Sequence, residues 1–231
     1  MLGITTIDII LLSNPADPAS HTVTSRCIQT LLASEDPAKI CFRVFVVVSG
    51  PKGPEALFPP ARTLYPETAF NYNLYRNAGI RAGEAKYVCL CHNDLLFQPA
   101  WASHLLEAFS RFADLSSASP RCPEHHSRLG FQPGGGIYNG YRNRFEVCGW
   151  CLFFKRDLLR LTGPLDENYS FWCADQDYGR TLEALRLRHA LVSAASVVHA
   201  EQAAPGQDRK ALTAGEFFYY EKKWNSRTLI R

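Results

Sequence analysis

Tyr87-Val88-Cys89-Leu90-Cys91-His92-Asn93-Asp94 is the stretch that decides the fold, because a short apolar run ends there on polar residues. Its first five residues are typical of a strand that is buried on both faces of a parallel sheet. Ligands of open parallel sheets bind beyond the carboxyl ends of the strands. Asp94 is therefore well placed to hold a divalent cation, although an acid at this point can instead cap the next helix.

Two similar apolar runs precede this stretch, at Ile7 to Leu12 and at Phe42 to Val48. They are closed by Ser13-Asn14-Pro15 and by Ser49-Gly50-Pro51. Apolar residues at helical spacing follow each run: Val23, Cys27 and Leu31; then Tyr72, Tyr75 and Ala78; then Trp101, Leu105 and Phe109. This alternation predicts an α/β fold with a mostly parallel central sheet flanked by helices.

Composition indicates a globular protein. The chain has 231 residues, of which 46% are apolar, 20% charged and 12% aromatic, which excludes a disordered or fibrous chain. The net charge of 25 − 22 = +3 is too small to indicate a nucleic-acid binder. No apolar run is long enough to span a membrane, and the first residues lack the basic region of a secretory signal. The eight cysteines favour free thiols and a cytoplasmic location.

We expect one domain over residues 1–231, made of two halves, 1–112 and 147–231, around a flexible loop at 113–146. Ser116 to Arg144 has little apolar periodicity and is interpreted as an irregular acceptor or lid segment. Gly134 to Gly136 can act as a hinge, and Arg142 and Arg144 can meet phosphate. Two tyrosines of this segment, Tyr138 and Tyr141, could stack on bases, which keeps a nucleic-acid acceptor open.

A second acidic cluster lies in Trp172-Cys173-Ala174-Asp175-Gln176-Asp177-Tyr178-Gly179-Arg180. Acids two positions apart diverge on a helix, so one can face a pocket as a general base while the other pairs with Arg180. An acidic helix start without chemistry is the alternative. His199 follows the apolar pair Val197-Val198, and it is a metal ligand only if the fold brings it near Asp94.

The order of these pieces resembles the GT-A fold glycosyltransferases, specifically the family-2-type inverting group. The resemblance covers Ile7 to about His199, and the Tyr219 to Trp224 stretch is similar to the ending of many members. The stretches that carry it are Asn77-Ala78-Gly79-Ile80, Tyr87 to Asp94, Phe97-Gln98-Pro99-Ala100-Trp101, Cys148 to Leu159, Gly163 to Tyr169, Asp175 to Leu182 and Val197-Val198-His199.

The resemblance implies a reaction and a set of roles. A sugar would pass from a nucleotide-diphosphate sugar to a hydroxyl acceptor, a glycan or lipid-linked glycan or else modified nucleic acid. Asp94 and His199 would hold a divalent metal, Mn²⁺ or Mg²⁺, on the donor diphosphate. Asp175 would act as the general base. The first half of the chain would bind the nucleotide sugar, and the second would bind the acceptor.

The resemblance also implies that Asn14, Ser49, Asn77 and Asn93 belong to the donor-binding site, with Asn14 beside the nucleoside. Three positions depart from the family pattern. His92 replaces the first acid of the metal motif, Ser49-Gly50-Pro51 replaces an acid after the second strand, and Ala174 replaces the Glu before Asp175.

Other functions remain open at this point. The departures at His92 and Ala174 are compatible with a catalytically impaired protein that only binds nucleotide sugars. A nucleotidyltransferase would share the sheet but would need a Gly/Arg/Lys-rich signature after the first strand, where Ser13-Asn14-Pro15-Ala16-Asp17 stands. An interaction protein without ligand is the remaining class, and it predicts no stabilisation by nucleotides.

Overall fold

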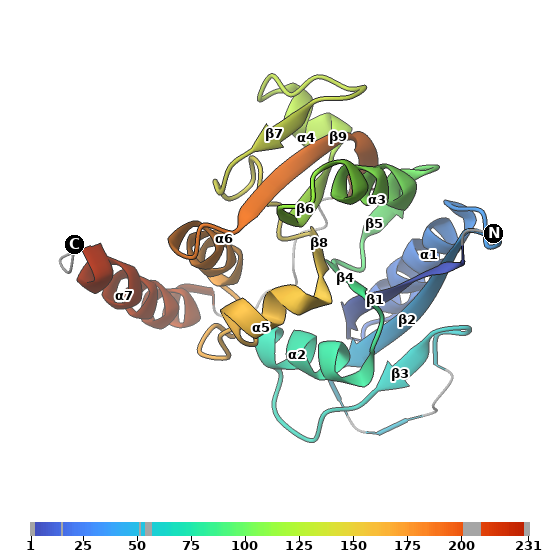
Figure 1. Cartoon of the computed structure of the whole chain (residues 1–231). Coiled ribbons are helices and arrows are strands. Elements are labelled where there is room, and N and C mark those ends of the chain that lie inside the picture. Colours follow the sequence, from blue (N-terminus) through green and yellow to red (C-terminus); the bar gives the residue numbers. More distant parts are fainter. Residues whose placement is uncertain (1–2, 15, 51, 54–56, 201–208, 229–231) are drawn as a thin grey trace.

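The computed structural model describes residues 3–14, 16–50, 52–53, 57–200 and 209–228 (Figure 1). Helices cover a large central sheet on both faces, so the predicted α/β fold is confirmed. The strands are β1 (Thr5–Ser13), β2 (Ile40–Val48), β3 (Arg62–Leu64), β4 (Tyr87–Cys91), β5 (Leu95–Phe97), β6 (Leu115–Arg121), β7 (Ile137–Asn139), β8 (Cys151–Lys155) and β9 (Arg188–His199). The helices are α1 (Pro18–Ala33), α2 (Tyr72–Ala82), α3 (Trp101–Arg111), α4 (Pro123–Ser127), η1 (Arg156–Leu158), α5 (Leu159–Thr162), α6 (Ala174–Ala184) and α7 (Arg209–Thr228).

The strand order is β3-β2-β1-β4-β8-β6-β9-β5, and β7 also pairs with β9. From β3 to β4 all pairings are parallel, so the carboxyl ends of these strands meet at one edge of the sheet. Beyond β4 the sheet is mixed. β8 runs antiparallel to β4 and β6, β6 and β9 are parallel, and β5 and β7 run antiparallel to β9.

Side chains alternate between the two faces of the sheet, as the period of a strand requires. On β4, Cys89 and Cys91 join the larger core, which also includes residues of α1 and α3. Val88 and Leu90 join the opposite core, together with residues of α2 and α6. The sheet is therefore buried on both faces, which explains why its first strands read as continuous apolar runs.

The predicted loop at 113–146 is wrong in part. Residues 115–121 form the buried strand β6, and residues 123–127 and 137–139 form α4 and β7. Strand β6 has the polar sequence Leu-Ser-Ser-Ala-Ser-Pro-Arg, which hides it from an apolar pattern. Its buried Ser117 hydroxyl is satisfied by Tyr178 Oη at 2.6 Å and by His189 Nδ1 at 2.9 Å, so the strand can be central without being apolar.

Other features of that segment are also fixed to the fold. The amides of Gly135 and Gly136 donate to Ser193 Oγ on β9, so the proposed hinge is tied to the sheet. Tyr138 and Tyr141 are partly buried and pack against the two cores. Arg142 is paired with the buried carboxylate of Glu146.

The C-terminal helix α7 lies beside α6 (Figure 1). Lys223 Nζ is 2.7 Å from both Asp166 Oδ2 and Asp177 Oδ1, and Trp224 Nε1 donates to Asp177 at 2.9 Å. The sequence predicted an ion pair between Asp177 and Arg180. In the structure Asp177 instead binds Lys223 and Trp224 of α7. Arg180 instead pairs with Glu183 at 3.0 Å. None of the described helices is long and apolar enough to cross a membrane.

Candidate functional site

Asp94 and His199 come together through the pairing of β5 with β9. Leu95, the first residue of β5, is the register partner of His199, the last residue of β9. Asp94 is therefore next to His199, and its carbonyl accepts from Ala200 N at 3.3 Å. Asp94 Oδ1 lies 3.3 Å from His199 Nε2. His199 therefore lies near Asp94, which was the condition for its predicted role as a metal ligand.

His92 completes a group of three possible metal ligands. Its Nδ1 is 3.3 Å from His199 Nε2, and all three candidate ligand atoms lie within 4.8 Å of one another. Tyr72 Oη is 2.9 Å from the other ring nitrogen of His92. On the far side, the Trp150 ring stacks on His199 with centroids 5.2 Å apart. Aromatic side chains thus hold both imidazole rings in place.

The electrostatics of this group suit a cation. Burial, followed by the positive charge of Arg76 and the neighbouring His199, lowers the pKa of His92 to about 3, so its ring is neutral and has a lone pair to donate. Burial opposes ionisation of Asp94, but His199 and His92 hold its pKa below the usual value. Asp94 Oδ1 is buried and has no hydrogen-bond partner among the described residues. Besides the nearby His199 ring, this oxygen could therefore accept a metal ion as a partner.

Asp175 lies in the first turn of α6, where the helix dipole favours a carboxylate. Its Oδ1 is 3.7 Å from Arg76 Nη1, too far for a hydrogen bond, and is also buried with no hydrogen-bond partner in the described chain. Burial raises the pKa of Asp175, and the charges of Arg76 and Arg144 oppose that rise. The side chain as a whole is 27% exposed, although its Oδ1 is buried.

Contacts run without a break from Asp175 to the His92 group. The Arg76 guanidinium next to Asp175 lies over the Tyr72 ring, 3.9 Å from its centroid, and donates to Gly149 O at 2.8 Å. Tyr72 in turn contacts His92. Helix α2 thus carries Tyr72 and Arg76, one helical turn apart, between the two acidic positions.

The segment that leads into Asp175 is fixed by one buried carboxylate on α7. Glu216 accepts from Ser170 N at 2.6 Å and from Phe171 N at 3.1 Å, and it also accepts from Ser170 Oγ and Trp172 N. Glu216 is 6% exposed, so these are buried, charge-assisted hydrogen bonds. Helix α7 therefore sets the path of the chain into α6.

The four predicted donor-binding residues have different environments. Ser49, at the end of β2, lines a cavity of about 810 Å³ together with Lys52, Tyr65, Phe70 and other residues. Asn14 is exposed after β1. Asn93 lies beside the metal-ligand group, and its amide donates to Thr24 Oγ1 on α1 at 2.9 Å. Their contacts with a donor remain a prediction.

The side chain of Asn77, the fourth predicted donor-binding residue, is engaged within the fold, and its contact with a donor also stays a prediction. Its side chain is 2% exposed and donates to Leu165 O and Glu167 Oε1, both at 2.9 Å. Its Oδ1 accepts from Leu165 N at 3.0 Å. Both N–H groups and one acceptor position of the oxygen thus hold the segment before α6.

Sequence reasoning missed Tyr72, Arg76, Gly149 and Trp150 as parts of this site. A signal was present for Arg76, because α2 buries polar residues on a face that apolar spacing predicts to be core. No local signal existed for Gly149. A β-carbon there would lie 1.8 Å from Asp175 Oδ2, a contact that only the fold creates.

Comparison with known proteins identifies solved structures that have a similar fold. No protein-family model matches the sequence, and no curated protein matches it. Among solved structures, the chain is similar to GalNAc-T7, whose crystal structure contains UDP, GalNAc and Mn²⁺, at 11% identity and a TM-score of 0.66. The alignment covers 88% of this chain and 45% of GalNAc-T7.

The chain is also similar to residues 1–349 of TarS from S. aureus, at 12% identity and a TM-score of 0.60. That alignment covers 84% of this chain and 59% of the other. This chain therefore spans roughly half the length of the two structures that it resembles. The expected GT-A fold is confirmed by these two likenesses.

Proposed function

We propose that this chain, which has the GT-A fold, transfers a sugar from a nucleotide-diphosphate sugar to a hydroxyl acceptor with inversion at the anomeric carbon. One observation carries the proposal. Contacts through Tyr72 and Arg76 join a group of three candidate metal ligands to the carboxylate of Asp175. A sugar transferase needs a cation site for the leaving group and a base for the acceptor, close together.

His92, Asp94 and His199 fit a divalent ion. Two imidazole nitrogens and one carboxylate oxygen lie within 4.8 Å of one another, and the buried Asp94 Oδ1 has no hydrogen-bond partner among the described residues. A set with two nitrogens favours Mn²⁺ over Mg²⁺, which prefers oxygen ligands. When bound, such an ion would neutralise the charge that develops on the departing diphosphate. Tyr72 and Trp150 would keep the two imidazoles oriented for it.

The cavity lined by Ser49 is the best place for the nucleoside. It opens at the end of β2, two strands from β4, and neighbouring strands are about 4.8 Å apart, so roughly 10 Å separates it from the metal ligands. A diphosphate can bridge a gap of that order. Tyr65 and Phe70 offer rings to a base, and Lys52 and Arg62 offer positive charge to phosphate.

Asp175 would take the proton of the acceptor hydroxyl as its oxygen attacks the anomeric carbon. The bond from that carbon to the diphosphate oxygen breaks in the same step, so the diphosphate leaves and the configuration inverts. Arg76 and Arg144 favour the ionised form of Asp175, and burial raises its pKa toward that of an effective base. Arg76 beside Oδ1 and Gly149 against Oδ2 would hold the carboxylate in position for the hydroxyl, and Oδ1 makes no hydrogen bond to a described residue.

The acceptor is proposed to be a glycan or a lipid-linked glycan. A nucleic-acid acceptor was considered because of Tyr138 and Tyr141, but both rings pack against the cores of the protein. That packing leaves each ring only partly exposed for stacking on a base.

The test is a thermal-shift panel of UDP, GDP, dTDP and CMP sugars, each with and without Mn²⁺. We expect at least one donor to raise the melting temperature only when Mn²⁺ is present. The same donor should then be consumed when acceptor hydroxyls are supplied. A donor that binds but is never consumed, with any acceptor offered, would indicate a nucleotide-sugar-binding protein. No shift with any donor would overturn the proposal.

A further inference from the structure

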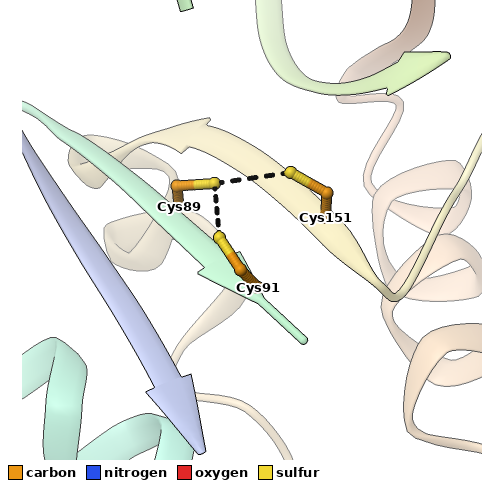
Figure 2. A group of neighbouring side chains, drawn as sticks. All are labelled: Cys89, Cys91 and Cys151. Atoms are coloured by element: carbon orange, nitrogen blue, oxygen red, sulfur yellow. Dashed lines mark hydrogen bonds between the residues drawn. The ribbon is translucent and has the colours of Figure 1, made fainter. Parts of the chain in front are cut away.

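Three cysteines converge in the core directly behind the candidate active site. Cys89 and Cys91 come from β4 and Cys151 from β8, and all three point to the same face of the sheet (Figure 2). The antiparallel register places Cys91 opposite Cys151. The three residues are 0–2% exposed. The pairing of two strands, rather than a local motif, thus assembles the group.

The sulfur atoms are close enough to share one ion. Cys89 Sγ is 3.2 Å from Cys91 Sγ and 3.6 Å from Cys151 Sγ, and all three lie within 4.8 Å of one another. A metal–thiolate bond of about 2.3 Å places sulfurs roughly 3.8 Å apart in a tetrahedral site and about 4.0 Å apart in a trigonal one. Both separations from Cys89 are shorter than these values, so small side-chain rotations that move the sulfurs apart would make room for an ion.

We propose that Cys89, Cys91 and Cys151 form a second metal site that takes one thiophilic ion of the Zn²⁺ and Cd²⁺ class. Thiolates are soft ligands and select such ions over Mg²⁺ or Mn²⁺. Each thiol that binds the ion would release its proton to solvent, and no oxidation is involved. This site differs in ligand chemistry from the one made by two imidazoles and a carboxylate.

The position of the three cysteines suggests what a bound ion would do. Cys91 is followed directly by His92, and Cys151 is preceded directly by Trp150, whose ring stacks on His199. An ion held by these thiols would fasten β4 to β8 at the point where each strand meets the candidate active site. It would therefore act as a structural brace, not as a catalyst.

The test uses the full chain, reduced and metal-free, with Cd²⁺ as the probe because thiolate ligands give it an ultraviolet charge-transfer band. Cd²⁺ is added either before or after refolding, since the thiols are buried, and excess ion is removed by gel filtration. We expect one Cd²⁺ per chain with a thiolate band and a higher melting temperature.

Variants separate this site from other binding. Loss of a residue that only orients a metal ligand weakens metal binding by about 10–100-fold. Cys89→Ser and Cys151→Ser each remove a ligand, so each should weaken Cd²⁺ binding by more than that. Cys41→Ala, at an exposed thiol, and Cys122→Ala, at a buried thiol outside the group, should keep the band. Asp94→Asn should also keep it, which excludes the other metal site as its source.

Variants in the core can lose stability for reasons unrelated to metal. The deciding quantity is therefore the Cd²⁺-induced change in melting temperature within each variant, measured on samples whose circular dichroism matches the wild type. The absence of a thiolate band in the wild type, in both orders of addition, would overturn the proposal. So would a band that persists in both serine variants. Either result would mean that the three cysteines are ordinary core residues.

Discussion

Gly149 lies against the carboxylate of Asp175 so closely that a β-carbon at position 149 would stand 1.8 Å from Asp175 Oδ2. The two residues are 26 positions apart and come from different parts of the fold. The carbonyl of Gly149 accepts from Arg76, which also faces Asp175. The proposed base, Asp175, can therefore occupy its position only because residue 149 has no side chain.

Gly149→Ala should abolish most transfer without unfolding the protein. The new methyl group would push the Asp175 carboxylate away from its position, and a displacement of about 1 Å can cost about 100-fold in rate. Initial rates of sugar transfer and a melting curve would measure the two effects. Gly215→Ala is the matched control, because a β-carbon there meets nothing within 4 Å. Equal rates for the two variants would contradict the role of position 149.

Asp175→Asn should lower the transfer rate by about 10²–10⁴-fold, the usual contribution of a general base. The amide has nearly the same shape but cannot take a proton, so donor binding in the presence of Mn²⁺ should be unchanged. Transfer assays and calorimetric titration of the donor would measure both. Asp36→Asn, at an exposed acid in the α1 to β2 connection, is the control. Transfer at the wild-type rate would show that another group is the base.

Tyr72→Phe should weaken Mn²⁺ binding by about 10–100-fold, because it removes the hydroxyl that orients His92. Metal affinity can be measured by calorimetry or by the Mn²⁺-dependent thermal shift. Tyr75→Phe is a close control on the same helix, since its hydroxyl is also hydrogen-bonded, at 2.9 Å, but to Thr68 O. An equal loss of Mn²⁺ affinity in both variants would indicate a general effect on α2.

Glu216→Gln should destabilise the protein by about 2–3 kcal/mol, because charge-assisted hydrogen bonds are lost. The effect should be local. The amides of Ser170 to Trp172 should exchange faster with solvent, and transfer should fall while Mn²⁺ affinity stays the same. Urea denaturation and hydrogen exchange would test this, with the exposed Glu107→Gln as control. Unchanged exchange at 170–172 would show that α7 does not fix this segment.

Stability should decrease as the pH falls from about 6.5 to 4. Burial lowers the pKa of both His126 and His189 to about 4, whereas an unfolded chain binds a proton near 6.5. The unfolded state therefore binds more protons in this window. The stability that the two neutral rings contribute is fully present above the unfolded pKa and is lost on acidification.

Each of the two histidines should contribute a slope of up to about 1.4 kcal/mol per pH unit. The pKa of His92 is lowered as well, so His189→Gln should remove about a third of the slope that the three rings contribute together, measured by urea denaturation at a series of pH values. His104→Gln, at a partly exposed ring on α3, should leave the slope unchanged. A wild-type stability that does not vary between pH 4 and 6.5 would show that these rings become protonated in the folded state.

The strongest predictions from sequence came from short-range patterns. Tyr87 to Cys91 was recognisable as a buried strand, because both of its faces carry apolar side chains. Strand β6 was missed because it buries a polar residue, Ser117, whose hydroxyl is hydrogen-bonded to side chains of α6 and β9. Such partners lie 61 and 72 positions away, and no local pattern contains them.

By itself, the sequence determined the parallel strands of the first half, the position of Asp94 at a strand end and the start of α6 at the Asp175 cluster. These features depend on neighbours within a few residues, which is the range over which strand and helix periodicity acts. The cytoplasmic location and the class of acceptor remain predictions.

Only the tertiary structure decided which residues meet. The pairing of β5 with β9 joined Asp94 to His199, the antiparallel pairing of β4 with β8 gathered three thiols, and packing of α2 placed Arg76 beside Asp175. Each of these contacts depends on strand register or helix packing between distant segments. The energy that selects them comes from burying the whole core at once, and it is not contained in any single stretch of sequence.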